Sequence, residues 1–202
     1  ISCGISKARI LNNIIRDNSD IGIHCSNSNA TILNNVITGN TTSGSGGGIY
    51  INNASPLISN NVIMGNFAAD GAGIFALDTE ATIFSNSIHG NVGIRGGGIQ
   101  NYNNNEDGEV LNLFSNMSSG NSAEKGGGIA CLRSENQITN SLIIGNAAQY
   151  AGGVYYTYPS RPDISNSVIT ENSASERAGG IQAVHIAWPT VINSIMRENT
   201  GS

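Results

Sequence analysis

Residues 63–75 read Ile63-Met64-Gly65-Asn66-Phe67-Ala68-Ala69-Asp70-Gly71-Ala72-Gly73-Ile74-Phe75, and variants of this stretch recur along the chain. Their common elements are Ile-x-Gly-Asn, a short loop of small residues, and then Gly-x-Gly-Ile. Aligned on the Asn, the repeats follow one another at intervals of 22 to 30 residues, at Asn18, Asn40, Asn66, Asn91, Asn121, Asn146, Asn172 and Asn199. A period of this length with local variation indicates a solenoid of stacked coils with variable loops.

Each coil also carries a second polar position and three apolar positions. The second polar row is typified by Asn61, and the apolar rows by Ile58, Ile63 and Ile74; Ser118 interrupts the Ile63 row. Three apolar positions predict three short strands per coil, and the polar rows predict ladders in which each amide bonds the next coil. The sequence therefore predicts an all-β fold, a right-handed parallel β-helix of about eight coils of about 25 residues.

One further row is apolar although it directly precedes the Ile63 row. Its members are Ile14, Val36, Val62, Ser87, Met117, Leu142, Val168 and Ile195. Neighbouring residues of an extended strand point to opposite sides, so one of the two rows is exposed unless the chain bends. We favour a bent core over an apolar stripe for a partner, because long apolar stripes are uncommon on soluble monomers.

Composition supports short strands and turns. Only 11% of the 202 residues are charged and 5% are aromatic, while 26 are Gly, a mixture poor for helices. The net charge is −5 and the basic residues are scattered singly, so we expect no nucleic-acid partner. No apolar run approaches the roughly 20 residues of a membrane span, so we expect no membrane insertion within this segment.

The cysteines and the two ends carry weaker signals. Cys3, Cys25 and Cys131 lack the paired spacing of a zinc or disulfide framework, so we interpret them as small buried hydrophobes, with Cys3 stacked under Cys25. Their redox state stays open, and we expect no metal and no cofactor. Because the repeat is cut partway through a coil at both ends, we expect residues 1–202 to be one β-helix domain from a longer solenoid, with neighbouring segments or subunits at its ends.

Several of these elements resemble a known repeat family. The segments are Asn66-Phe67-Ala68, Asn121-Ser122-Ala123, Asn146-Ala147-Ala148, Asn172-Ser173-Ala174, Gly127-Gly128-Ile129 and Gly179-Gly180-Ile181. They resemble the Phe-x-x-Asn and Gly-Gly-Ala-Ile signatures of polymorphic outer-membrane proteins, which lie on the β-helical passenger of autotransporter adhesins. Here Ile or Ser replaces the Phe, and Gly replaces the Ala. More broadly the repeat resembles the pectate-lyase-like fold, which implies a β-helix but leaves adhesins, polysaccharide lyases, hydrolases and phage tailspikes open.

The strand after the glycines carries the candidate ligand-binding residues. The residue after its inward Ile is predicted to face solvent in every coil, which gives the row His24, Tyr50, Phe75, Gln100, Ala130, Tyr155 and Gln182. Aromatic faces flanked by amides bind sugars by stacking and hydrogen bonding. Our ligand-binding candidates on this side are Tyr50, Phe75, Tyr102, Asn103, Tyr155, Tyr158 and Trp188. The alternative is a solvated face, or one covered by another segment.

A second row on this side offers weak catalytic candidates. Asp78, Arg133 and His185 fall in one line, which invites comparison with polysaccharide lyases of this fold, where an Arg or Lys abstracts a proton beside a uronate carboxylate. Asp78 and Arg133 would lie two coils apart, about 10 Å, which is beyond hydrogen-bond reach. The acidic stretch 106–109 is predicted to be a solvated loop tip. We therefore lean against an enzyme.

The sequence thus leaves three functional hypotheses. The first is an extracellular or cell-surface adhesin or structural segment with an aromatic face that binds a glycan or a surface protein. The second is a polysaccharide lyase or glycoside hydrolase of the pectate-lyase-like class. The third is a subunit of a filament or larger surface assembly, because open solenoid ends can stack.

Overall fold

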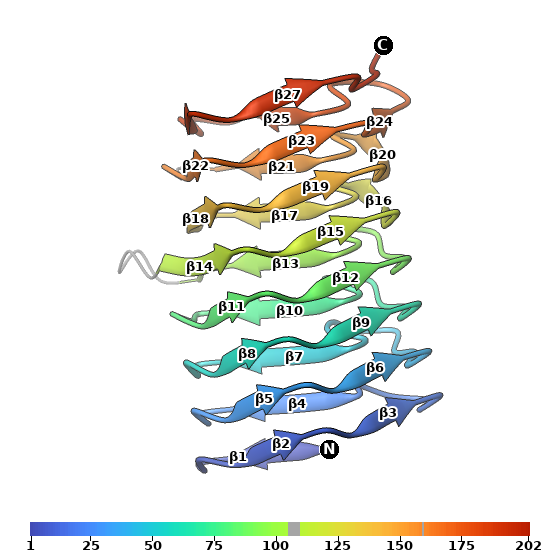
Figure 1. The fold of residues 1–202 in the computed structure, drawn as a ribbon, viewed down its shortest axis with the longest axis vertical. Coiled ribbons are helices and arrows are strands. Elements are labelled where there is room, and N and C mark those ends of the chain that lie inside the picture. Colours follow the sequence, from blue (N-terminus) through green and yellow to red (C-terminus); the bar gives the residue numbers. More distant parts are fainter. Residues whose placement is uncertain (105–109, 159) are drawn as a thin grey trace.

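The chain winds into a parallel β-helix whose coils stack from the N-terminus to the C-terminus (Figure 1). The computed structural model describes residues 1–104, 110–158 and 160–202. In these residues, 24 strands form three parallel sheets of eight strands each, and every coil contributes one strand to each sheet. The predicted eight coils and three strands per coil are confirmed.

We call the three large sheets A, B and C, in the order in which each coil enters them. Sheet A consists of β1 (Ser2–Gly4), β4 (Ile23–Ser26), β7 (Ile49–Asn52), β10 (Ile74–Leu77), β13 (Ile99–Tyr102), β17 (Ile129–Leu132), β21 (Val154–Thr157) and β25 (Ile181–Ala183). Sheet B consists of β2 (Arg9–Leu11), β5 (Thr31–Leu33), β8 (Leu57–Ser59), β11 (Thr82–Phe84), β14 (Val110–Phe114), β18 (Glu135–Thr139), β22 (Asp163–Ser165) and β26 (Thr190–Ile192). Sheet C consists of β3 (Ile14–Arg16), β6 (Val36–Thr38), β9 (Val62–Met64), β12 (Ser87–His89), β15 (Met117–Ser119), β19 (Leu142–Ile144), β23 (Val168–Thr170) and β27 (Ile195–Arg197).

A small fourth sheet, which the sequence did not predict, runs along the loops between sheets C and A. It consists of β16 (Ser122–Lys125), β20 (Ala147–Tyr150) and β24 (Ser173–Ala174). Isolated bridges continue it through the lower coils, pairing Asp70 with Ser45 and with Arg95. The loops are therefore stacked as regularly as the strands, which fixes their side chains relative to sheet A.

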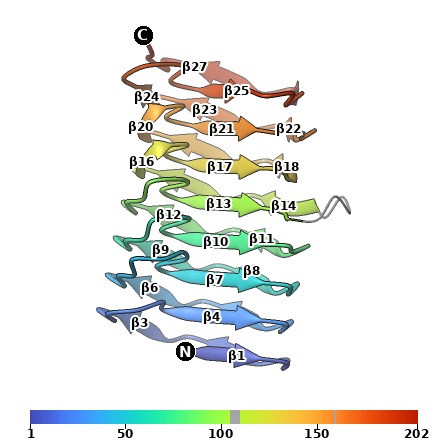
Figure 2. The same ribbon diagram turned by 180° about the vertical axis from the view of Figure 1, so that it is seen from behind.

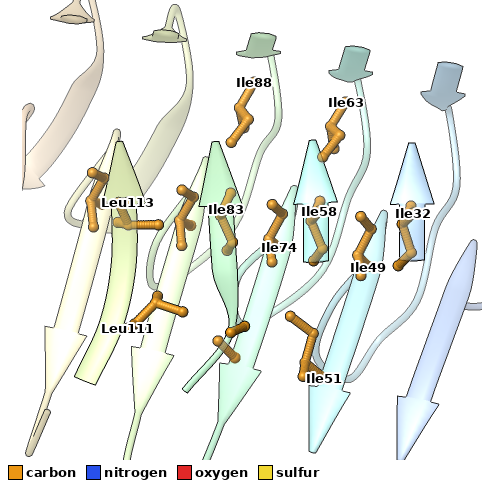
Figure 3. Close-up of a cluster of buried hydrophobic side chains, with 14 of the residues drawn as sticks. Ile32, Ile49, Ile51, Ile58, Ile63, Ile74, Ile83, Ile88, Leu111 and Leu113 are labelled. Carbon is orange, nitrogen blue, oxygen red and sulfur yellow. The ribbon is translucent and has the colours of Figure 1, made fainter. Parts of the chain in front are cut away.

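The core is a set of isoleucine columns inside the three sheets. Ile49, Ile58, Ile63 and Ile74 are fully buried, as are their counterparts in neighbouring coils (Figure 3). Successive strands pair in register, so Ile74 lies between equivalent isoleucines of the coils below and above. Each such side chain contributes about 1.5–3 kcal/mol when fully buried. A single coil could not bury these residues alone, so stability comes from stacking.

The predicted asparagine ladders are present at two corners. Asn66 donates from its backbone N and from Nδ2 to Asn91 Oδ1, at 2.9 and 3.0 Å, and Nδ2 also donates to Ile37 O at 3.0 Å. Asn91 makes the same bonds to Asn121 and to Ile63 O. In the second ladder Asn61 donates to Asn86 in the same way. These buried amides therefore satisfy one another, as buried polar groups must.

Ser118, which interrupts the Ile63 row, is accommodated by the ladder beside it. Its hydroxyl is buried, accepts from Asn121 Nδ2 at 3.1 Å and lies 3.4 Å from Gly128 O. A polar residue can replace Ile here because the ladder supplies hydrogen-bond partners.

The glycine pairs are required by close contact between coils. A Cβ added to Gly73 would lie 2.4 Å from Gly98 O, and one added to Gly48 would lie 2.5 Å from Gly73 O. The backbones of adjacent coils therefore approach too closely for a side chain at these positions, while the positive φ belongs to the residue before each pair, such as Gly71 with φ +52°. At that residue the loop turns sharply back toward sheet A.

The prediction that the Val36 row belongs to a bent core is wrong. In β6 and β9 only the central residue is buried, while Val36 and Val62 lie on the outer face of sheet C and are partly exposed. Ile14 at one end is 71% exposed. The strands stay extended through this row, so alternate side chains point outward and form an apolar outer stripe.

We expect Asn91→Ala to lower the free energy of unfolding by about 3 kcal/mol, because it leaves the buried backbone N of Asn66 without its acceptor and removes the side-chain amide bonds to Ile63 O and Asn121 Oδ1. Urea unfolding followed by circular dichroism measures this change. Asn112→Ala is the matched control, since the Asn112 side chain lies on the outer face of sheet B and, within the described part of the chain, bonds only Val110 O. Similar losses in both variants would contradict a structural role for the ladder.

Candidate functional site: a groove over sheet A

A groove of about 480 Å³ runs across the outer face of sheet A, the sheet seen at the front in Figure 2. It is lined by Ser45, Tyr50, Asp70, Phe75, Leu77, Arg95, Gln100, Tyr102, Asn104, Leu132, Arg133 and Tyr158. These residues come from five successive coils, so the groove follows the solenoid axis for roughly 19 Å at the spacing of parallel strands. Its volume is in the range of small-molecule binding sites.

The floor of the groove is the outward row of sheet A. Tyr50, Phe75 and Gln100 lie side by side on β7, β10 and β13, and the Tyr50 and Phe75 rings stack at 5.4 Å between centroids. Partial burial, followed by the charge of Asp78, raises the pKa of Tyr50. The phenol therefore stays protonated at neutral pH and can donate a hydrogen bond.

This row is much less exposed than the sequence predicted. Phe75, Gln100, Ala130 and Tyr155 are all buried, at 8% exposure or less. The cause is the loop before each of these strands, which folds back over the row at a residue with positive φ, namely Gly71, Gly96, Gly126 or, before Tyr155, Ala151. A Cβ on Gly71 would lie 2.7 Å from Phe75 Cα, so the loop backbone rests directly on the strand. The prediction of a fully open aromatic face is therefore wrong.

One wall of the groove is built from these folded-back loops. Arg95 Nε and Nη2 donate to Asp70 Oδ1 and Oδ2 at 2.6 and 2.9 Å, a bidentate pair. With its amide nitrogen toward the wall, Gln100 donates to Asp70 Oδ1 and to Arg95 O, both at 3.0 Å. Hydrogen bonding to Asp70 raises the pKa of Arg95, against the opposing effect of partial burial. The pair is partly exposed, so its main effect is to shape the wall rather than to stabilise the fold.

The opposite wall is formed by the turns that end sheet A. The Arg133 guanidinium lies 4.9 Å from the centroid of the Tyr158 ring, and Tyr158 stacks on His185 at 5.9 Å. Arg133 and Tyr158 are exposed and have φ of 53° and 65°, in the left-handed region. Asn104 completes this wall at the coil below Arg133.

The structure brings together most of the predicted ligand-binding residues. Tyr50, Phe75, Tyr102 and Tyr158 line the groove. Tyr155 is buried at 8% exposure, Asn103 is buried at 2%, and neither lines it. Trp188 is 58% exposed but lies outside the groove, with Arg161 5.6 Å from its ring centroid.

The catalytic candidates are not assembled into a centre. Asp78 is buried and accepts from Asn104 N at 2.6 Å and from Asn104 Nδ2 at 3.2 Å, so its carboxylate caps a turn. His185 Nδ1 lies 3.2 Å from Thr157 Oγ1, outside the groove. Only Arg133 lines it. The predicted loop tip at 106–109 lies outside the described residues.

Sequence reasoning missed Ser45, Asp70 and Arg95. Each directly precedes the glycine at which its loop turns back, namely Gly46, Gly71 or Gly96. Aligning the coils on that glycine, instead of on the asparagine, places Asp70 next to Arg95 and indicates an ion pair between adjacent coils. The sequence therefore contains the information for this ion pair, but the variable length of the loops obscures the alignment of Asp70 with Arg95.

Two kinds of feature are absent from the described residues. Across residues 1–104, 110–158 and 160–202, no three His, Cys, Asp or Glu side chains are grouped so as to hold a metal ion. In the same part of the chain, no helix has the length and apolar character needed to cross a membrane.

The stacked sheets and the axial groove define the class of this protein as a parallel β-helix with a lateral groove. Consistent with this, the sequence model of the family described as right-handed beta helix region matches residues 1–116, more than half of the chain, and the protein belongs to that family. No curated protein and no solved structure gave a match. The finer resemblances to adhesin passengers and to polysaccharide lyases remain predictions.

The three cysteines are buried and free, and Cys3 lies directly beside Cys25 in the pairing of β1 with β4. Burial, reinforced by the neighbouring Cys3, raises the pKa of Cys25 to about 12. Burial also raises the pKa of Cys131. Because the thiolate is the reactive form, thiols with raised pKa values are inert at neutral pH. The interpretation of the cysteines as buried small hydrophobes is confirmed.

We accordingly expect Cys25 and Cys131 to resist a thiol-specific reagent in the folded protein at pH 8. A thiol whose pKa is near 12 has almost no thiolate at pH 8, whereas in the unfolded chain its pKa returns to about 8.5 and a quarter or so is ionised. A colorimetric thiol count with and without urea, with the modified residues located by mass spectrometry, measures this. Rapid labelling of Cys131 in the native state would contradict the buried core.

Proposed function

We propose that this protein is an extracellular or cell-surface β-helical segment that binds a glycan along the groove over sheet A. The observation that carries the proposal is the floor of the groove, where Tyr50 stacks on Phe75 beside the Gln100 amide. Aromatic rings offer flat apolar surfaces to the C–H faces of sugars, while amides and hydroxyls can pair with sugar hydroxyls.

The shape of the site favours a glycan over a surface protein. The groove follows the axis across five coils, which suits an extended chain of several sugar rings. Stable protein interfaces need about 800 Å² on each partner, arranged around a central apolar patch. A groove of about 480 Å³ with ionic walls fits a slender, hydroxyl-rich ligand better.

Tyr50→Ala is expected to weaken binding of an oligosaccharide about tenfold, because it removes the exposed ring of the floor and its phenolic donor. A glycan array identifies ligands of the unaltered protein, and calorimetry then compares the variants. Tyr102→Ala is expected to act in the same direction, since Tyr102 lines the groove one coil above Phe75.

Phe114→Ala is the matched control. Phe114 is also stacked on an aromatic neighbour, Phe84, at 5.1 Å, but lies on the outer face of sheet B. Its loss should leave binding unchanged. Absence of any glycan ligand, or equal effects of the Tyr50 and Phe114 substitutions, would remove the groove from consideration.

The second candidate is a polysaccharide lyase, favoured by the presence of a groove with Arg133 on its wall. Against it, Asp70 is the sole carboxylate among the described lining residues, and Arg95 occupies both of its oxygens. Glycosidases use two carboxylates, and lyases need a base placed against the substrate. Incubating the protein with acidic polysaccharides and measuring the ultraviolet absorbance of unsaturated products tests this candidate; we expect no release of such products.

A further inference from the structure

We infer that the groove selects anionic saccharides, and that Arg133 binds their carboxylate or sulfate group. This inference rests on the proposed glycan-binding function and specifies its ligand class. Two features of Arg133 support it: it has no counter-ion among the described residues, and its guanidinium packs against the Tyr158 ring at the groove.

Of the two arginines that line the groove, Arg133 is the one that no carboxylate of the described part of the chain pairs with. Arg95 on the opposite wall is held by both oxygens of Asp70, so its charge is already compensated. Among the described residues, no ion pair involves Arg133, and its guanidinium packs against the Tyr158 ring at 4.9 Å. Ring contact restrains the guanidinium while its N–H groups stay free for a bidentate anion such as carboxylate or sulfate.

The backbone at Arg133 is also unfavourable for an arginine. Equivalent turns of lower coils carry Asn27, Asn53 and Asp78, all with positive φ. Asn and Asp tolerate this left-handed conformation, whereas longer side chains rarely adopt it. Arg133 thus occupies a position that Asn would adopt more readily, and Tyr158 and His185 show the same conformation at the equivalent turns of the next two coils.

The other charges around the groove place the anion at its Arg133 end. Asp78 lies on the turn directly after β10, one coil above Tyr50, and its carboxylate raises the pKa of Tyr50 in addition to the larger effect of burial. A ligand anion near Tyr50 would be repelled by that carboxylate, while one near Arg133, three coils above Tyr50, would be attracted. Sugar rings would then contact Tyr50 and Tyr102 while the acidic substituent reaches Arg133.

Binding of three fluorescent oligosaccharides of equal length and backbone, one neutral, one carboxylated and one sulfated, tests this inference by polarisation. We expect the unaltered protein to bind at least one anionic form about tenfold more tightly than the neutral form, with the advantage shrinking at high salt. The relative affinities of the carboxylated and sulfated forms show which anion the site prefers.

Arg133→Asn is the decisive variant, because Asn relieves the left-handed strain while removing the charge. We expect it to melt at the same temperature as the unaltered protein or higher, to lose the tenfold preference, and to bind the neutral form as before. Arg133→Lys should keep part of the preference for the anionic form. Lys retains the positive charge but lacks the planar guanidinium that can pair with two oxygens of one anion. Arg161→Gln is the matched control, because Arg161 also lies over an aromatic ring but outside the groove.

The outcomes distinguish a failure of the role assigned to Arg133 from a failure of glycan binding by the groove. Equal binding of neutral and anionic forms, or a preference that survives Arg133→Asn, would overturn the role of Arg133 while leaving glycan binding in place, provided that Tyr50→Ala still weakens it. Failure of the unaltered protein to bind any glycan would overturn the proposed function and this inference together.

Discussion

The amide ladder at the corner between sheet C and the following loop is the contact on which the rest of the structure depends. Asn66 and Asn91 each bond the asparagine of the next coil through both backbone and side chain, and each also bonds the carbonyl of an isoleucine in the preceding coil. This geometry is satisfied at only one spacing and one register between coils. Isoleucine columns then stack in line, and Gly73 must be glycine because the adjacent backbone is too close for a Cβ.

Because the spacing between coils is fixed, the loops between sheets C and A stack in order even though their sequences vary. The loops after the ladder stack on one another through bridges, so Asp70 and Arg95 meet although they are 25 residues apart in sequence. Each loop folds back over sheet A and forms one wall of the groove. The turns at the other ends of the same strands form the opposite wall. The groove is therefore a product of regular stacking combined with irregular loops.

The sequence was sufficient for the fold because each structural constraint repeats in every coil. Ile58, Ile63, Ile74 and Asn66 recur at fixed spacing, and eight copies of one pattern leave little ambiguity about strands and ladders. The groove was only partly predictable, because it depends on features that differ between coils. Tyr50 and Phe75 were found by register, but the burial of their row was missed, since periodicity does not reveal a loop that folds back over a strand. The Val36 row was misassigned because apolar character was taken as evidence of burial, whereas the ladder spacing keeps sheet C extended.

The turns that end the strands of sheet A explain why such a scaffold can change its ligand without changing its fold. The backbone N of Asn53, Asp78 and Arg133 each donates to a carbonyl of the next coil, at 3.1 to 3.2 Å. The stack therefore imposes the left-handed conformation, whichever side chain is present. Asn and Asp adopt the left-handed conformation readily, while Arg133 and Tyr158 are kept in this conformation by the neighbouring coils. Because the backbone is fixed by contacts that these side chains do not make, the groove wall can vary from coil to coil, and its chemistry must be read from individual residues rather than from the repeat.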